Sequence, residues 1–208
     1  MSGHLRIRWT IVPSTAPQPL INCNRCGGLK PYRCSGRFRV NANGKRIDAW
    51  LIYRCVDCDN SWNFGILERC SRRDIEPARL AALESNDPVL AYRHAFDVIA
   101  LRRQVGRVEE FPDVAVRKEV LEGTRESAAV LELRLGLEMS TSLRLDRLLS
   151  GELSISRSRL QALEEKRLLS VDPEGAKALR KPARQGTTVR IDLVGEDDRQ
   201  AIISAAGG

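Results

Sequence analysis

Two cysteine pairs constrain the fold of this chain more than any other feature. Cys23-x-x-Cys26 and Cys55-x-x-Cys58 are separated by 28 residues. Two cysteines spaced in this way can direct both sulfurs at one point from a tight turn. Four thiolates form the tetrahedral soft-ligand set that suits Zn²⁺. The pattern therefore predicts a structural zinc site.

The residues between the two pairs predict a β-hairpin. Asn43-Gly44 is a strong hairpin signal because both residues tolerate positive φ. It lies between the alternating stretch "RFRVNA" and the β-former-rich stretch "RIDAWLIYR". The hairpin would return the second cysteine pair to the first. We therefore expect residues 1–73 to form a zinc ribbon.

Three other chemistries of the cysteines fit the sequence less well than, or no better than, a structural zinc site. A thioredoxin-like redox pair should open a helix after a strand, whereas both pairs here flank a hairpin. An iron–sulfur cluster with four cysteine ligands stays possible. A catalytic zinc keeps one position open, but four thiolates leave none. Cys34 and Cys70 have no CxxC partner, and we expect them to be buried free thiols.

Length and composition limit the class of protein. The chain has 208 residues, 42% of them hydrophobic, which favours two small domains with real cores. Arginines and prolines interrupt the first twenty residues, and no stretch approaches the ~20 apolar residues of a membrane span. We expect a soluble cytoplasmic protein with no membrane partner, whose six cysteines are metal ligands or free thiols.

Charge is distributed unevenly around a net value of +7. Residues 1–73 contain 13 basic and 4 acidic residues, and residues 140–194 contain 11 and 7. Residues 74–139 are acidic, with 9 basic against 13 acidic residues. Basic ends indicate a polyanionic partner such as nucleic acid. No phosphate-binding glycine loop, nucleophile elbow or acid–base pair is present, so we predict no enzyme and see no small-molecule substrate.

The predicted ribbon is rich in cations, and its role has two interpretations. The cations are Arg25, Lys30, Arg33, Arg37, Arg39, Lys45 and Arg46. With Tyr32 and Phe38 interleaved, they suit a phosphate backbone with exposed bases. Alternatively, Phe38 and Trp50 fill a small core and the arginines are only solvated.

Residues 74–128 are expected to form a helical connector packed on the ribbon. "SNDPVLAYRHAFDVIALRRQ" predicts one helix, capped by Asp87, with Val89, Tyr92, Phe96 and Ile99 on its apolar face. "DIEPARLAALES" predicts a shorter helix before it. "VEEFPDVAVRKEVLEGTRES" predicts a loop and a short helix. His94 is expected to be a packing or surface residue.

Residues 129–194 predict an α+β module, followed by a tail at 195–208. "AAVLELRLGLEMS" alternates as a half-buried strand does. Two short helices follow, the second capped by Ser156, and then the strands of "RLLSVD" and "TTVRIDLVG".

This region resembles the S-four-like RNA-binding domain, first described in a small-subunit ribosomal protein. The resemblance rests on Arg144, Leu145, Asp146, Ser156, Arg157, Leu163, Leu169, Val171, Lys181, Pro182 and Gly186. The sequence departs from the family's pattern at three turns: Arg167 replaces the usual glycine, Asp172-Pro173 replaces Asn-Gly, and Thr187 replaces aspartate.

The resemblance implies contact with RNA through the two helices and the adjoining loop. The cations placed there are Arg144, Arg147, Arg157, Arg159, Lys166, Arg167 and Lys181. Such cations can bind phosphates. We further expect Asp146 to orient Arg157.

The whole chain resembles an uncharacterised bacterial family, domain of unknown function 1062. "CNRCGG", "SGRFRVNANGKRIDAWLIYRCVDCDNSWN", "NDPVLAYRHAFD" and "LRLDRLLS" carry this resemblance, which implies no known activity. Together, the patterns predict an α+β, zinc-containing, non-catalytic RNA-binding protein whose target is ribosomal or transfer RNA. The alternatives are a zinc-ribbon DNA-binding or transcription-associated factor and an RNA-modifying enzyme.

Overall fold

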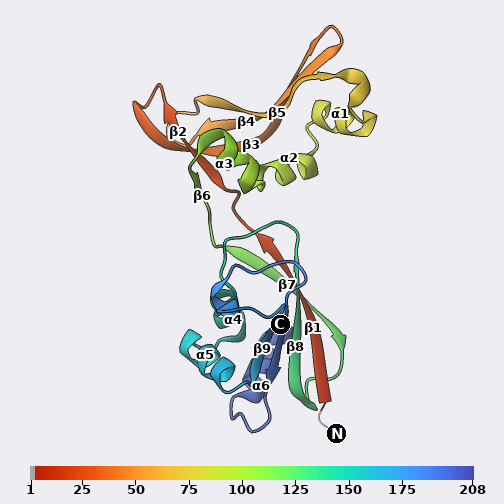
Figure 1. Ribbon diagram of the computed structural model, residues 1–208, viewed down its shortest axis with the longest axis vertical. Coiled ribbons are helices and arrows are strands. Elements are labelled where there is room, and N and C mark those ends of the chain that lie inside the picture. Colours follow the sequence, from red (N-terminus) through yellow and green to blue (C-terminus); the bar gives the residue numbers. More distant parts are fainter. Residues whose placement is uncertain (1–2) are drawn as a thin grey trace. The chain divides into compact units, whose positions relative to one another are not determined.

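The computed structural model describes residues 3–208 as a mixed α+β fold of two compact units (Figure 1). We call Thr15–Phe111 the cysteine unit. The described residues up to Ser14, together with Pro112–Gly208, form the leucine unit. The chain therefore enters the cysteine unit from the leucine unit and returns to it.

The elements of the cysteine unit are β2 (Gln18–Cys23), β3 (Gly28–Asn43), β4 (Arg46–Cys55), β5 (Ser61–Ser71), η1 (Arg72–Asp74), α1 (Pro77–Glu84), α2 (Pro88–Ala95), α3 (Val98–Val105) and β6 (Val108–Glu109). Those of the leucine unit are β1 (Gly3–Pro13), β7 (Val114–Glu122), β8 (Ala128–Leu137), α4 (Leu145–Leu153), α5 (Arg157–Glu165), β9 (Leu169–Asp172), η2 (Ala178–Arg180), β10 (Thr188–Asp192) and α6 (Arg199–Gly207).

The leucine unit is built on a sheet with strand order β7-β1-β8-β10-β9. Strands β1 and β8 are parallel, and the other neighbours are antiparallel. Alternate residues of β1, such as Leu5, Ile7 and Trp9, are fully buried. The predicted strand of "AAVLELRLGLEMS" is confirmed as β8, with Leu131 and Leu133 in the same core.

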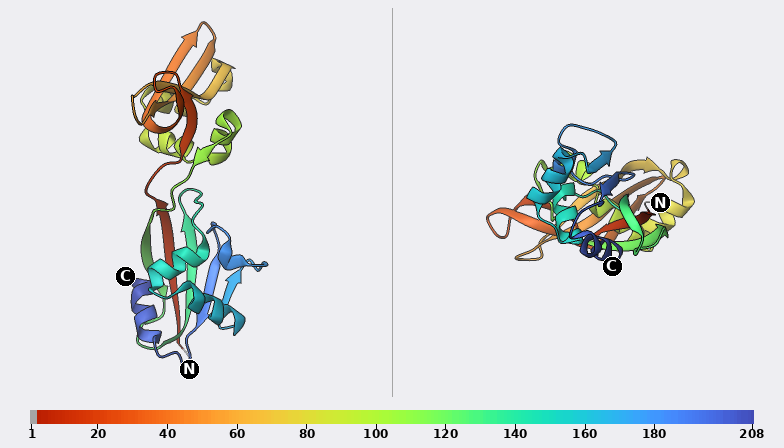
Figure 2. Two further views of the ribbon diagram at one scale, coloured as in Figure 1. Left: turned by 90° about the vertical axis from the view of Figure 1, so that its left-hand side faces the viewer. Right: turned by 90° about the horizontal axis from the view of Figure 1, so that it is seen from below.

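Helices α4 and α6 pack against each other beside this sheet (Figure 2). Ile202 and Ile203 of α6 are buried, and the Trp9 indole N–H donates to the Ala206 carbonyl at 2.9 Å. Residues 195–208 had been expected to be a tail. The apolar face of α6 instead completes the core of the leucine unit.

The predicted helix–helix–strand–strand order is present as α4, α5, β9 and β10. The Ser156 side chain accepts from the Arg159 backbone N–H at 3.1 Å, which confirms the predicted cap of α5. At the other end of α5, Arg167 has φ 60° and replaces the glycine expected there. Its N–H donates to Glu164, and the Leu168 N–H donates to Leu163, as in a Schellman motif.

The cysteine unit contains a sheet with strand order β5-β4-β3-β2-β6. The predicted hairpin is confirmed: Asn43 pairs with Arg46 across the turn, and Gly44 has φ 61°. A bulge lies between Cys34 and Phe38, where the pairing of β3 with β4 shifts its register. Phe38, Leu51 and Tyr53 are buried on one face of this sheet.

The single helix predicted for residues 85–104 is wrong. The chain forms α2 and α3, and the Asp97 side chain starts α3 by accepting from the Ala100 N–H at 2.9 Å. Ile99, in α3 after the break, is 69% exposed, and Val89, in the first turn of α2, is 56% exposed, so neither belongs to a buried stripe. Asp87 does cap α2, through the Leu90 N–H.

Two other segments differ from the sequence-based expectation. Residues 1–13 had been assigned to the ribbon, but β1 pairs with β7 and β8. Residues 108–127 had been expected to form a loop and a short helix, but β7 is a strand at the edge of the leucine unit's sheet. Both differences arise from pairing between residues that lie more than 100 positions apart. No helix within residues 3–208 has the length and hydropathy needed to cross a bilayer.

Candidate metal centre

Sheet topology brings the four cysteines together. Cys23 ends β2, and Cys55 ends β4. Both strands are antiparallel to β3, so they run in the same direction. Their last residues therefore lie at the same end of the sheet. Each CxxC pair then forms the turn into the next strand, β3 or β5. The predicted hairpin is therefore what aligns the two turns.

The two turns have the same backbone geometry. The N–H of Gly27 donates to the Cys23 carbonyl at 2.9 Å, and the N–H of Asp59 donates to the Cys55 carbonyl at 3.0 Å. Gly27 has φ 68° and Asp59 has φ 55°, so a left-handed residue follows each pair. This repetition indicates two equivalent knuckles, each presenting two sulfurs to a shared point.

The sulfur positions fit a single metal ion. All four sulfurs lie within 4.8 Å of one another, with Cys23–Cys58 at 3.5 Å and Cys26–Cys55 at 3.9 Å. A tetrahedron with metal–sulfur bonds of about 2.3 Å has edges of about 3.8 Å. A four-iron cluster places each cysteine on a different iron and so spreads the sulfurs further apart. Cys23, Cys26, Cys55 and Cys58 could thus hold one metal ion.

Polar groups next to the sulfurs stabilise negative charge there. Tyr32 is buried, and its hydroxyl hydrogen-bonds to Cys23, which is the main reason that the pKa of Cys23 is lowered to about 5. The Asn60 amide nitrogen lies 3.8 Å from the same sulfur. In contrast, the pKa of Cys26 is raised to about 12, first by its hydrogen bond with Cys58 and then by burial. Four neighbouring thiolates need a cation to coexist.

Cations around the knuckles are partly neutralised. Lys30 pairs with Asp57 at 2.7 Å, and Arg33 pairs with Asp59 at 2.9 Å. These contacts tie β3 to the second knuckle. Two of the cations predicted to contact nucleic acid therefore already have carboxylate partners in the protein.

Cys34 and Cys70 do not belong to the cluster. Both are free and only half-buried, although we expected buried thiols. Burial still raises the pKa of Cys34. The Cys70 thiol lies 3.6 Å from the Glu68 carbonyl.

The seven cations predicted to contact RNA lie at helix ends and in the adjoining loop of the leucine unit. Arg144 precedes α4, and the chain there pairs with residues 181–183 through the Arg144–Pro182 bridge. Lys181 is thereby placed beside the start of α4. Arg157 begins α5, and Lys166 and Arg167 end it.

These seven cations differ in how free they are. Arg159 forms an ion pair with Glu196, and Arg144 binds the buried Asp146 through two hydrogen bonds of 2.5 and 3.1 Å. Asp146 was expected to orient Arg157 but contacts Arg144 instead. Within residues 3–208, the other five have no carboxylate partner: Arg147, Arg157, Lys166, Arg167 and Lys181.

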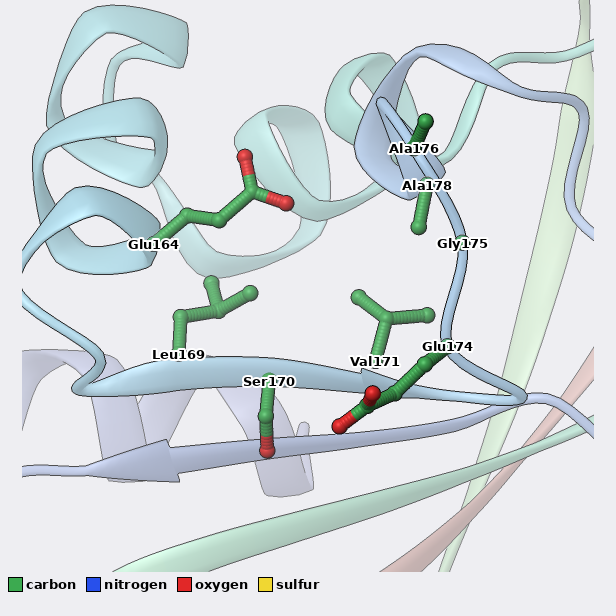
Figure 3. A pocket seen from close by; sticks show the side chains of 8 residues that line it. All are labelled: Glu164, Leu169, Ser170, Val171, Glu174, Gly175, Ala176 and Ala178. Carbon is green, nitrogen blue, oxygen red and sulfur yellow. The ribbon is translucent and has the colours of Figure 1, made fainter.

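A pocket of about 460 Å³ lies beside α5 in the leucine unit (Figure 3). Leu169 and Val171 point from β9 toward it, and Glu164 and Glu174 supply carboxylates. No histidine or cysteine lines this pocket, and its charge is unsuited to phosphate. It therefore adds nothing to an anion-binding surface.

The two aromatic residues expected among the ribbon's cations are buried. Tyr32 and Phe38 are 1% and 8% exposed, so neither ring is available to a partner. Trp50 is partly exposed because it lies on β4 between the buried Ala49 and Leu51. The alternation of "RIDAWLIYR" contained this signal: residues 47, 49, 51 and 53 are the apolar set, and Trp50 belongs to the opposite face.

The fold and site define a two-unit α+β protein with a four-cysteine site that could bind a metal ion. Comparison with protein families matches residues 40–174 to DUF1062, which is described as a protein of unknown function. The chain belongs to this family. Searches of curated proteins and of solved structures returned no match.

Proposed function

We propose that the protein is a non-catalytic, zinc-containing RNA-binding protein whose target is structured RNA such as ribosomal or transfer RNA. The observation that carries this proposal is the set of exposed cations without carboxylate partners at the ends of α4 and α5: Arg147, Arg157, Lys166, Arg167 and Lys181. Helix ends present side chains and backbone N–H groups to phosphates in a fixed register.

The proposed metal is Zn²⁺ and its role is structural. Four thiolates complete a tetrahedral shell, so the ion would have no position for substrate or water. Zinc would fix both knuckles and thereby hold β2, β3, β4 and β5 in register. Metal analysis of protein purified without added metal should give one zinc per chain. Protein that keeps an ordered cysteine unit without any metal would contradict the assignment.

RNA binding is tested by charge reversal in the leucine unit. Arg147→Glu with Arg157→Glu should weaken binding to ribosomal or transfer RNA by 10-fold or more, because at least two phosphate contacts become repulsive. Arg159 is unsuitable for this test, since its reversal would also break the ion pair with Glu196.

The matched control is Arg79→Glu with Arg103→Glu. Both arginines are exposed on helices of the cysteine unit and form no ion pair within residues 3–208, and the change in net charge is the same. Equal losses in the two double variants would mean that net charge alone determines binding. Binding of duplex DNA with equal affinity would favour the DNA-binding alternative.

A further inference from the structure

The sheet of the cysteine unit has one face covered by helices. The Phe38 backbone N–H donates to the Asn86 side chain at 2.6 Å, and the Phe38 ring meets His94 edge-on at 6.2 Å. Leu51 and Tyr53, on the same face of β4, are fully buried. Helices α1 and α2 therefore pack against this face.

On the opposite face, Trp50 of β4 lies between an arginine of β3 and a glycine of β5. Trp50 pairs with Arg39 on β3 and with Gly65 on β5. Cross-strand partners lie on the same face of a sheet, so Arg39 flanks Trp50 on one side. Gly65 has no side chain of its own on the other side, where the Glu68 carboxylate and the Gln104 amide lie close to it. The indole is partly exposed on this three-stranded surface.

This face is rich in cations. By alternation along β4, Arg46 and Arg54 lie on the same side as Trp50. Arg39, Arg46 and Arg54 are exposed, and none of them forms an ion pair within residues 3–208. We call these four residues, Arg39, Arg46, Trp50 and Arg54, the Trp50 face.

By the same alternation Asp48 lies on this face too, and the Glu68 carboxylate lies beside it, but neither forms an ion pair with these arginines within residues 3–208. Asp48 accepts the Arg69 backbone N–H at 2.7 Å, and the Glu68 carboxylate lies close to Gly65. The Arg46 guanidinium contacts a backbone carbonyl, that of Arg69, at 2.9 Å. Its charge therefore remains available to an anion.

Arg46 of the Trp50 face also lines one of two hollows near the β3–β4 turn, at the opposite end of the sheet from the knuckles. One cavity of about 520 Å³ is lined by Asn43, Arg46, Asp48 and Arg69. A second, of about 340 Å³, is lined by Gly44, Lys45, Ser71, Arg72 and Arg73. Five cations thus surround the two hollows at this end of the sheet.

We propose that the Trp50 face binds a single-stranded segment of RNA, with one base stacked on Trp50 and the flanking phosphates on Arg39, Arg46 and Arg54. Every base offers a π-face, so an exposed indole among arginines binds single strands with little sequence preference. A paired helix is excluded from such stacking because its bases are already stacked. This inference rests on the proposed RNA-binding function and assigns it a second site, in the other unit.

The test uses the zinc-loaded full chain and a fluorescein-labelled 12-mer of oligouridylate, measured by fluorescence anisotropy. Trp50→Ala should weaken binding roughly 5- to 150-fold, the range that loss of one base–aromatic stack gives. Trp50→Phe should retain most of the affinity because it keeps an aromatic face. Arg39→Glu with Arg46→Glu should weaken binding more than the control Arg79→Glu with Arg103→Glu does.

A second readout separates stacking from folding. Oligouridylate should quench tryptophan fluorescence of the wild-type chain, and Trp50→Phe should remove most of that quenching while its zinc content and circular dichroism stay unchanged. Unaltered affinity in Trp50→Ala, or unaltered quenching in Trp50→Phe, would overturn the proposal. Binding of oligothymidylate as tight as that of oligouridylate would overturn its assignment to RNA.

Failure of this inference can be told apart from failure of the proposed function. If Arg147→Glu with Arg157→Glu abolishes binding of structured RNA while Trp50→Ala changes no affinity, the leucine unit alone binds RNA. If the wild-type chain retains neither structured RNA nor oligouridylate at low salt, both proposals fail.

Discussion

At the scale of single residues, Arg167 combines a conformational cost with a proposed function. A non-glycine residue in the left-handed region costs about 1–2 kcal/mol of conformational energy. Replacing it with glycine removes this cost, but the greater entropy of glycine in the unfolded chain offsets part of the gain. Arg167→Gly should therefore raise the unfolding free energy of the leucine unit by about 0.5–1 kcal/mol. It should also weaken RNA binding, because one cation is lost. Urea denaturation and RNA titration of the same variant measure both effects.

Lys166 provides the control for this prediction. It directly precedes Arg167 but has φ −76°, in the right-handed region. Lys166→Gly should lower the unfolding free energy, by about 0.5–1 kcal/mol, because only the entropic cost of glycine remains. A fall in stability in both variants would mean that the left-handed conformation of Arg167 carries no cost.

His94 makes the stability of the cysteine unit depend on pH. Burial and the nearby charge of Arg79 lower the pKa of His94, and Asp97 opposes the shift only in part. Protonation therefore favours the unfolded chain. Stability should be constant above the unfolded pKa of about 6.5 and should fall as pH drops through that value toward the folded pKa.

Denaturation of the full chain between pH 7.5 and 5.5 measures this slope. His94→Gln should flatten it, since the substituted side chain does not titrate. The metal content of the protein must be the same at each pH for the comparison to hold. A slope as steep in the variant as in the wild type would assign the pH dependence to another group.

At the scale of elements, the two cysteine knuckles depend on a left-handed residue after each pair. Gly27 has φ 68°, and a Cβ there would meet no atom within 4 Å, so substitution costs conformational energy alone. Gly27→Ala should lower the unfolding free energy of the cysteine unit by about 0.5–1 kcal/mol, because the smaller entropy of the unfolded chain offsets part of the cost of the left-handed conformation. It should also weaken retention of the metal against a chelator, because strain at residue 27 opposes the turn that directs the Cys23 and Cys26 sulfurs at one point.

Gly28 is the matched control. A Cβ at Gly28 would also meet open space, but its φ is not in the left-handed region. Gly28→Ala should leave metal retention unchanged and should not lower the unfolding free energy, since alanine is compatible with this φ. Equal effects of the two substitutions would mean that the knuckle does not depend on the conformation of Gly27.

At the scale of the whole molecule, metal removal should affect one unit and spare the other. The four cysteines join β2–β3 to β4–β5, whereas the leucine unit has its own core of buried residues. A structural metal contributes directly to folding free energy. Chelation should therefore increase hydrogen exchange within residues 15–111 and leave residues 3–14 and 112–208 protected.

Cys58→Ser should reproduce the effect of the chelator. It removes one of the four candidate metal-binding thiols at the end of the sheet where the two knuckles meet. Exchange mass spectrometry with and without chelator measures each unit in the same experiment. Increased exchange in both units would show that they do not unfold separately.

The sequence by itself determined the features that local chemistry controls. CxxC spacing and Asn43-Gly44 were sufficient to predict the knuckles and the hairpin, because turn geometry depends on a few adjacent residues. The caps at Asp87 and Ser156 and the alternation of β8 were equally local. These predictions are confirmed by the hydrogen bonds and burial of the residues concerned.

Only the tertiary structure decided which distant segments combine. Strand β1 lies more than 100 residues from β7 and β8, and no local pattern states that they pair. The same holds for α6, whose apolar side chains are buried only because Trp9 and its neighbours lie beneath them. Which face of β4 the helices cover also depends on packing, and Trp50 lies on the opposite, partly exposed face. Sequence specifies local geometry through a few adjacent residues, whereas burial is settled by the sum of long-range contacts.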